Sequence, residues 1–198
     1  ILINDVRYSP AGVLAPIQKS DLAFTMHMLY HLSETGTCAI VEFPGVLYRG
    51  NAEKKIREYL IKNNFVDTVI QLPANLFFGV GIATCIIVIK KNKKDNNILF
   101  VDASGECEKK GDKNKLEDKN QNRIVNAYQE RKEEQYFSKL VSNDEVLANG
   151  ANLSVSSYVE KEDKREVIDI VKLNEEIQTL QSEIFTLNTE IANKIASL

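Results

Sequence analysis

The chain has 198 residues, of which 43% are hydrophobic and 27% charged, and its formal net charge is -3 at pH 7. This composition is typical of an ordinary globular protein, and the near-neutral charge excludes a chain that holds nucleic acid by itself through many phosphate contacts. No apolar run approaches about 20 residues and no signal-peptide pattern opens the sequence, so we expect no membrane span and no signal peptide. Cys38 and Cys85 lie inside apolar segments and are expected to be reduced core residues, which suits a cytoplasmic protein.

The first 36 residues predict a loop followed by one helix. Residues 1–19 contain Pro10, Gly12 and Pro16, which break regular structure. Ser20 and Asp21 can cap a helix that continues to about residue 33, with Leu22, Met26 and Leu29 on one face. The chain opens at Ile1 without a methionine, which suggests a piece of something longer.

Residues 37–91 predict a strand–helix–strand unit followed by a third strand. The strands are expected at residues 37–43, 66–72 and 83–90, and the helix begins near Asn51. This order and its short connections predict a parallel α/β sheet, in which ligands bind beyond the carboxyl ends of the strands. The loops after the first two strands would line that face.

The arrangement of apolar and charged residues in this helix predicts one buried side and one exposed side. Its apolar residues form one stripe, and we expect its charged residues to lie outside. The stripe consists of Ala52, Ile56, Tyr59 and Leu60, and the charged residues placed outside are Glu53, Lys54, Lys55 and Arg57.

The loop at residues 75–81 is the strongest sign of a ligand site. Phe77 and Phe78 are followed by Gly79 and Gly81, which allow a sharp backbone turn that presents a ring outward. Such a ring at the end of a strand could stack on a planar ligand such as an extruded base. The alternative is that both rings are core residues and the glycines only permit a hairpin.

The second half of the chain predicts smaller elements. We expect a strand at residues 98–102, an exposed charged loop at 106–122, a helix at about 121–134, a capped short helix at 142–149 and an extended segment at 153–159.

A heptad pattern marks the last segment. Apolar residues recur in steps of four and three, and the pattern is interrupted only where Lys194 takes a seam position. The seam residues that we expect to contact a partner are Leu173, Ile177, Leu180, Ile184, Leu187 and Ile191. The alternative is a helix that folds back on its own domain.

Several common functional motifs do not occur in the sequence. It contains no G-x-G-x-x-G or P-loop, and its four prolines are isolated, so that no Asn-Pro-Pro-aromatic motif is present. Cys38, Cys85 and Cys107 do not have the spacing of metal ligands, and His27 and His31 lack an acidic third ligand. We therefore expect no metal site.

Four segments, taken together, resemble the carboxyl-terminal part of the modification subunit of type I restriction–modification systems. They follow the order and spacing of that family across nearly the whole chain. The segments are Phe43–Leu60, Leu72–Thr84, Phe100–Gly105 and Asn149–Val159.

The resemblance implies a fold, an activity and partners. It implies the second half of a Rossmann-like methyltransferase sheet (residues 1–104), a charged loop and small helical region (105–160) and a long partner helix (161–198). The family transfers a methyl group from S-adenosylmethionine to the exocyclic amine of adenine in DNA. Its partners are DNA, a specificity subunit, which the last helix would contact, and a restriction subunit.

The resemblance also implies which site residues this chain contains. The cofactor loop and the Asn-Pro-Pro-aromatic motif would lie upstream of Ile1, so we assign no catalytic and no cofactor-binding residue, and we expect the chain alone to be inactive. Phe77, Phe78 and Gly79 would lie on the side of the target base, and Arg49 could contact a phosphate or form a structural ion pair. Two other functions stay open, namely an interaction module or half of a small-molecule methyltransferase.

Overall fold

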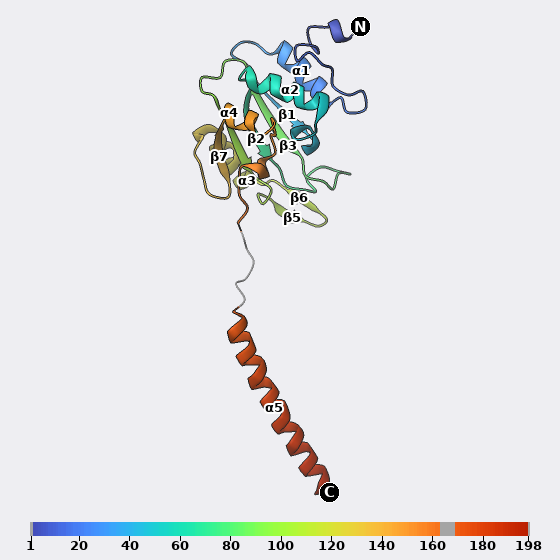
Figure 1. Ribbon diagram of the computed structural model, residues 1–198, viewed down its shortest axis with the longest axis vertical. Helices are drawn as coiled ribbons and strands as arrows, with labels where there is room; N and C mark the ends of the chain where they lie inside the picture. Colours follow the sequence, from blue (N-terminus) through green and yellow to red (C-terminus); the bar gives the residue numbers. More distant parts are fainter. Residues whose placement is uncertain (1, 163–168, 198) are drawn as a thin grey trace. The chain divides into compact units, whose positions relative to one another are not determined.

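The computed structural model describes residues 2–162 and 169–197 and divides the chain into two units, residues 1–161 and 162–198. The first unit, called the body below, contains a five-stranded sheet with helices on both faces (Figure 1). The second unit contains one helix. No helix in the described part of the chain combines the length and the apolar character needed to cross a membrane.

The sheet is mixed rather than parallel. Its spatial order is β1-β3-β2-β4-β7. The strands are β1 (Thr37–Glu42), β2 (Val66–Gln71), β3 (Cys85–Lys90), β4 (Asn97–Asp102) and β7 (Ser138–Ser142). β1, β2 and β4 run in one direction, and β3 lies between β1 and β2 and is antiparallel to both.

The prediction of an all-parallel sheet was therefore wrong, although β1 and β2 do point the same way. The connection from β2 to β3 contains no helix, and without a crossover helix β3 returns antiparallel beside β2. β7 was not predicted. It pairs antiparallel with β4.

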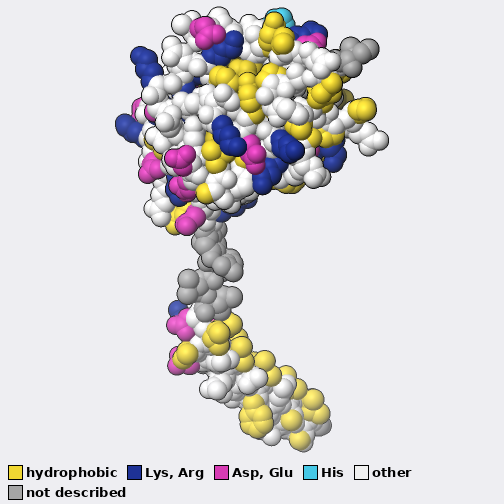
Figure 2. All heavy atoms as spheres, turned by 45° about the horizontal axis from the view of Figure 1, so that its top comes forward, with side chains coloured by type: hydrophobic (Ala, Val, Ile, Leu, Met, Phe, Trp, Pro, Cys, Tyr) yellow, Lys and Arg dark blue, Asp and Glu magenta, His cyan; other side chains and the backbone are white. Residues whose placement is uncertain are grey.

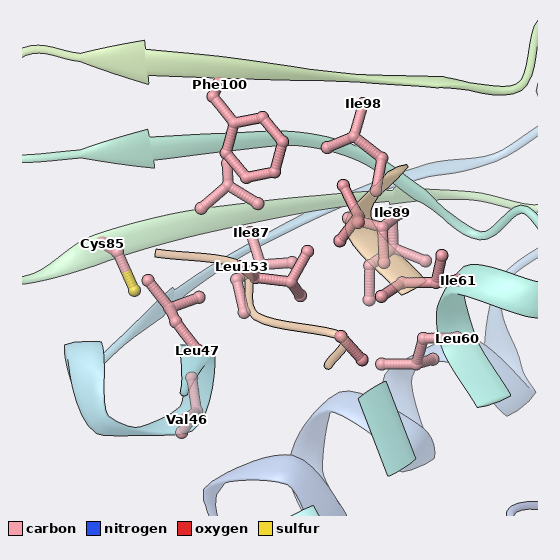
Figure 3. Close-up of a cluster of buried hydrophobic side chains, with 14 of the residues drawn as sticks. Val46, Leu47, Leu60, Ile61, Cys85, Ile87, Ile89, Ile98, Phe100 and Leu153 are labelled. Carbon is pink, nitrogen blue, oxygen red and sulfur yellow. The ribbon is translucent and has the colours of Figure 1, made fainter. Parts of the chain in front are cut away.

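Three α-helices and two short 3-10 helices pack on one face of the sheet. They are α1 (Asp21–His31), α2 (Asn51–Lys62), α4 (Asn143–Ala148), η2 (Pro44–Leu47) and η3 (Val155–Ser157). Figure 3 shows the centre of this core, where Leu60 and Ile61 of α2 and Leu47 of η2 approach Ile87 and Ile89 of β3. The other face is covered by α3 (Asp118–Glu130), through Ile124.

Helix α2 corrects the predicted division into buried and exposed residues. Glu53 and Arg57 were expected outside, but only 3% of Glu53 and 1% of Arg57 is exposed. Arg57 donates hydrogen bonds to the carbonyl oxygens of Ala151, at 2.7 Å, and Val46, at 2.9 Å. Its side chain thus connects α2 to two other segments, and burial lowers its pKa to about 10.

Two further predictions need correction. The segment 106–122 was expected to be a loop, but it contains a hairpin of β5 (Glu108–Lys110) and β6 (Lys113–Lys115), and α3 begins at Asp118. The segment 153–159 was expected to be extended, but it includes η3, and the ring of Tyr158 packs at 4.3 Å from the ring of Phe100. The buried backbone turn is stabilised because the Tyr158 hydroxyl donates to the Asn152 carbonyl.

The remaining elements are η1 (Leu2–Asn4) near the start of the chain and α5 (Ile170–Ala196) in the second unit. Helix α5 begins at an aspartate cap, since the Asp169 carboxylate accepts from the backbone N–H groups of Val171 and Lys172. Its 27 residues include the whole predicted seam, and none of them is buried.

Candidate functional site

A pocket of about 300 Å³ lies where the carboxyl end of β1 meets the loop between β2 and β3 and the first residue of α1. The loops after both strands therefore do contribute to one site, as the topology predicts. The residues that line the pocket are Asp21, Val41, Glu42, Phe43, Phe77, Val80 and Thr84.

The structure separates the two adjacent phenylalanines of the loop. Phe77 lines the pocket and is 42% exposed, whereas Phe78 is 99% exposed. Gly79 has a φ of +73°, a conformation that a residue with a side chain rarely adopts, and this turn follows directly after the two rings. Phe78 therefore faces outward, as was predicted for one of the two rings, and neither ring is a core residue.

The hairpin β5–β6 holds the aromatic loop. The backbone N–H of Asn114 donates to the carbonyl of Asn75 at 3.1 Å, and its side-chain amide donates to the carbonyl of Ala74 at 2.8 Å. The Lys113 ammonium lies 3.5 Å from the carbonyl of Phe77. These contacts hold the backbone of residues 74–77, which leads from β2 to the two rings.

Glu42 is a pocket residue that the sequence did not reveal. It ends β1, it is 7% exposed, and its carboxylate accepts a hydrogen bond from the Thr25 hydroxyl at 3.1 Å. Burial raises the pKa of Glu42 to about 7, and the nearby Asp21 also raises it, while the bond from Thr25 lowers it. A carboxyl group with this pKa can donate or accept a hydrogen bond near neutral pH.

Thr84 contributes a second polar group to the pocket. Its side chain is 5% exposed, and its hydroxyl has no hydrogen-bond partner among the described residues. The pocket thus combines the rings of Phe43 and Phe77 with a carboxyl and an unpaired hydroxyl. Rings that can stack and a few polar groups that can bond to an edge suit a planar ligand with polar atoms.

Arg49 does not line this pocket. Its guanidinium donates to Glu53 at 2.9 Å and lies 3.9 Å from Asp21, which does line the pocket. A β-carbon at Gly45 would collide with this guanidinium, so glycine at that position leaves the arginine its place. Arg49 is therefore joined to the site through Asp21.

The predicted seam of α5 is exposed along its whole length. Its side chains are between 44% and 58% exposed, and Figure 2 shows hydrophobic side chains gathered along this helix. The residues are Leu173, Ile177, Leu180, Ile184, Leu187 and Ile191.

The family model that this chain matches and two of its relatives are all described as methylases. The family model described as N-6 DNA Methylase matches residues 1–167. The methylase subunit of the type I restriction enzyme MpnII of Mycoplasma pneumoniae is 44% identical over 198 residues, which are 100% of this chain and 36% of that protein. The MjaVII methylase subunit of Methanocaldococcus jannaschii is 34% identical over 176 residues, which are 86% of this chain and 30% of that protein.

A solved structure agrees with these relatives. The crystal structure of a type I restriction–modification methyltransferase subunit from Streptococcus thermophilus is 43% identical and superposes with a TM-score of 0.79. The match covers 80% of this chain and 34% of that one. The chain therefore spans about a third of the length of the relatives it matches.

Proposed function

The chain belongs to the N-6 DNA methylase family, and from that premise we propose that it forms the target-base side of the pocket of an adenine-specific DNA methyltransferase. The complete subunit would transfer the methyl group of S-adenosylmethionine to the N6 amine of adenine within a type I restriction–modification complex. The observation that carries the proposal is the ring of Phe77 in a polar-edged pocket at the carboxyl end of the sheet.

We propose different tasks for the two rings. Phe77 stacks on the extruded adenine, because it lines a pocket whose polar groups can bond to the edge of a base. Phe78, with nearly all of its surface exposed, faces the duplex that the base has left. The turn at Gly79 keeps the two rings in these positions.

Arg49 is proposed as a phosphate contact beside this pocket. Its bond to Glu53 at 2.9 Å is shorter than its separation from Asp21 at 3.9 Å. A phosphate would therefore take the place of Asp21 while Glu53 continues to hold the guanidinium.

The cofactor side of the site is proposed to lie on protein that continues the sheet. β1 pairs only with β3 among the described residues, so that its other edge offers free backbone groups. Val41 and Phe43, on one side of this edge, are 50% and 43% exposed. An unpaired edge with apolar side chains suits the addition of a further strand, as the second half of a Rossmann-like sheet requires.

No residue of this chain is assigned to the cofactor or to the chemical step. The 198 residues contain no glycine-rich cofactor loop and no Asn-Pro-Pro-aromatic motif. We therefore propose that the chain by itself does not methylate DNA. Methyl incorporation above background, with the purified chain, S-adenosylmethionine and site-bearing DNA, would contradict this.

The proposed partners are DNA, the specificity subunit and, in the whole complex, the restriction subunit, all in the cytoplasm. Helix α5 would dock on the specificity subunit through its exposed seam. A second function follows from the same helix: as it stands, the chain is an interaction module. Removal of the residues after Leu173 should abolish this docking and leave the body folded.

The test of the base-side proposal compares single substitutions in the full-length subunit, assembled with its specificity subunit. Stacking of a base on an aromatic ring contributes about 1–3 kcal/mol. Phe77→Ala should therefore lower the equilibrium constant for base extrusion roughly tenfold, measured by the fluorescence of a base analogue at the target position. Phe78→Ala should reduce DNA affinity more than extrusion.

The control is Tyr30→Ala, since Tyr30 is a comparably exposed ring (49%) on α1 that does not line the pocket. It should leave extrusion unchanged. If Phe77→Ala behaves like Tyr30→Ala, Phe77 does not stack on the base.

A further inference from the structure

Helix α5 carries a charge pattern that restricts which helix can pair with its seam. With Ile177, Ile184 and Ile191 at the a positions of the heptads, Leu173, Leu180 and Leu187 fall at the d positions. β-branched residues at a and leucine at d favour two-stranded coiled coils. The seam thus predicts one partner helix.

The two flanks of this seam differ in charge. The g position immediately before each isoleucine is a glutamate in three successive heptads: Glu176, Glu183 and Glu190. The e position after each leucine is neutral: Asn174, Gln181 and Asn188. All these residues are exposed, and the three glutamates form no ion pair with another residue of 169–197. One side of the seam is therefore an acidic row.

A second copy of this helix does not complement the row. In a parallel pair, each g position faces an e position of the other helix, so that Glu176 and Glu183 would face the neutral Gln181 and Asn188. In an antiparallel pair, g positions face each other and glutamate would meet glutamate. Neither orientation gives an electrostatic attraction between the e and g positions, and in the antiparallel orientation the facing glutamates repel each other.

We propose that α5 pairs with a helix of another protein that presents lysine or arginine along the flank facing Glu176, Glu183 and Glu190. The apolar seam supplies most of the binding, and the acidic row selects a basic partner over a second copy of this chain. The proposal rests on the docking role of α5 given above, and it adds the chemistry of the partner's surface.

The test uses the whole chain and synthetic helices rather than the specificity subunit. Two peptides of about four heptads share isoleucine at a and leucine at d; one has lysine at e and g, and the other has glutamate there. At about 0.1 M salt the chain should bind the lysine peptide at least tenfold more tightly than the glutamate peptide, and 1 M salt should reduce the difference. Sedimentation of the chain alone at micromolar concentration should give the mass of a single chain.

Neighbouring residues provide a matched pair of variants. Glu176 lies at a g position, whereas Glu175 lies at the outer f position. Glu176→Lys should weaken binding of the lysine peptide by about two- to fivefold, and Glu175→Lys should change it much less. Circular dichroism of both variants checks that the helix is retained.

The outcomes separate this proposal from the docking role itself. Equal binding of the two peptides, or a dimer of the chain that persists with the lysine peptide present, would overturn the charge selection. Selective binding of the lysine peptide by a chain that does not bind the specificity subunit would support the charge selection and contradict the proposed docking.

Discussion

Helix α2 buries five of its twelve residues in the body, whereas helix α5, with 27 residues, buries none. Both are amphipathic. The apolar stripe of α2 finds its counterpart in the sheet, and even its charged Glu53 and Arg57 have partners inside the body. The seam of α5 is apolar along its length and remains exposed. An amphipathic pattern thus predicts which face needs to be covered, but the covering surface can belong to the same chain or to another.

Among substitutions in α2, we expect a change at Arg57 to have the largest effect on the free energy of unfolding. Arg57→Ala would leave the carbonyl groups of Val46 and Ala151 without their donor and open a cavity in the core. We expect a loss of about 3–5 kcal/mol in the free energy of unfolding, measured with urea. Lys55→Ala, on the exposed side of the same helix, should change it by less than about 0.5 kcal/mol. Similar losses for both variants would mean that Arg57 does not connect these segments.

A matched pair of leucines compares the two helices directly. Leu60 of α2 is 1% exposed and Leu180 of α5 is 57% exposed. Leu60→Ala should cost about 2–5 kcal/mol of unfolding free energy, while Leu180→Ala should cost less than about 0.5 kcal/mol in the isolated chain. The order should reverse for binding of a helical partner, which only Leu180→Ala should weaken. A large loss of stability in Leu180→Ala would mean that the seam is covered within this chain.

The sequence predicts the parts of the fold that depend on local patterns. The apolar runs of β1, β2 and β3 and the periodic residues of α2 identify these elements, because alternation and helical spacing are properties of neighbouring residues. Arg57 could not be placed in this way, since one of its acceptors, Ala151, lies 94 residues further along the chain. The antiparallel direction of β3 was open to prediction, because the β2–β3 connection lacks the helix that a parallel crossover uses.

The site was predicted only in part for the same reason. The two adjacent phenylalanines and the glycines of residues 77–81 are visible in the sequence, but which ring lines the pocket depends on the fold. Glu42 gave a weak signal as an acid at the end of an apolar strand. Its burial depends on α1, which brings Thr25 within hydrogen-bond distance.

Two buried acids extend the comparison to polar groups. Glu53 is paired with Arg49 at 2.9 Å, whereas the carboxylate of Glu42 accepts a bond from a neutral hydroxyl, and burial raises its pKa from 4.5 to about 7. Between these two pH values the folded chain keeps the proton of Glu42, but the unfolded chain has lost it. The free energy of unfolding should therefore fall as the pH rises through this window, by up to about 3 kcal/mol, and the contribution of Glu42 should be constant above it.

Glu42→Gln isolates this contribution, because all other titrating groups are shared with the unsubstituted chain and the amide oxygen can still accept the bond from Thr25. Urea unfolding of both proteins at several pH values between 4.5 and 7 should show the variant gaining stability relative to the unsubstituted chain as the pH rises. A difference that stays constant across this range would mean that Glu42 ionises as readily in the folded chain as in the unfolded one. The pocket would then hold a permanent negative charge, and the Glu42 carboxylate could accept hydrogen bonds from a ligand but not donate them.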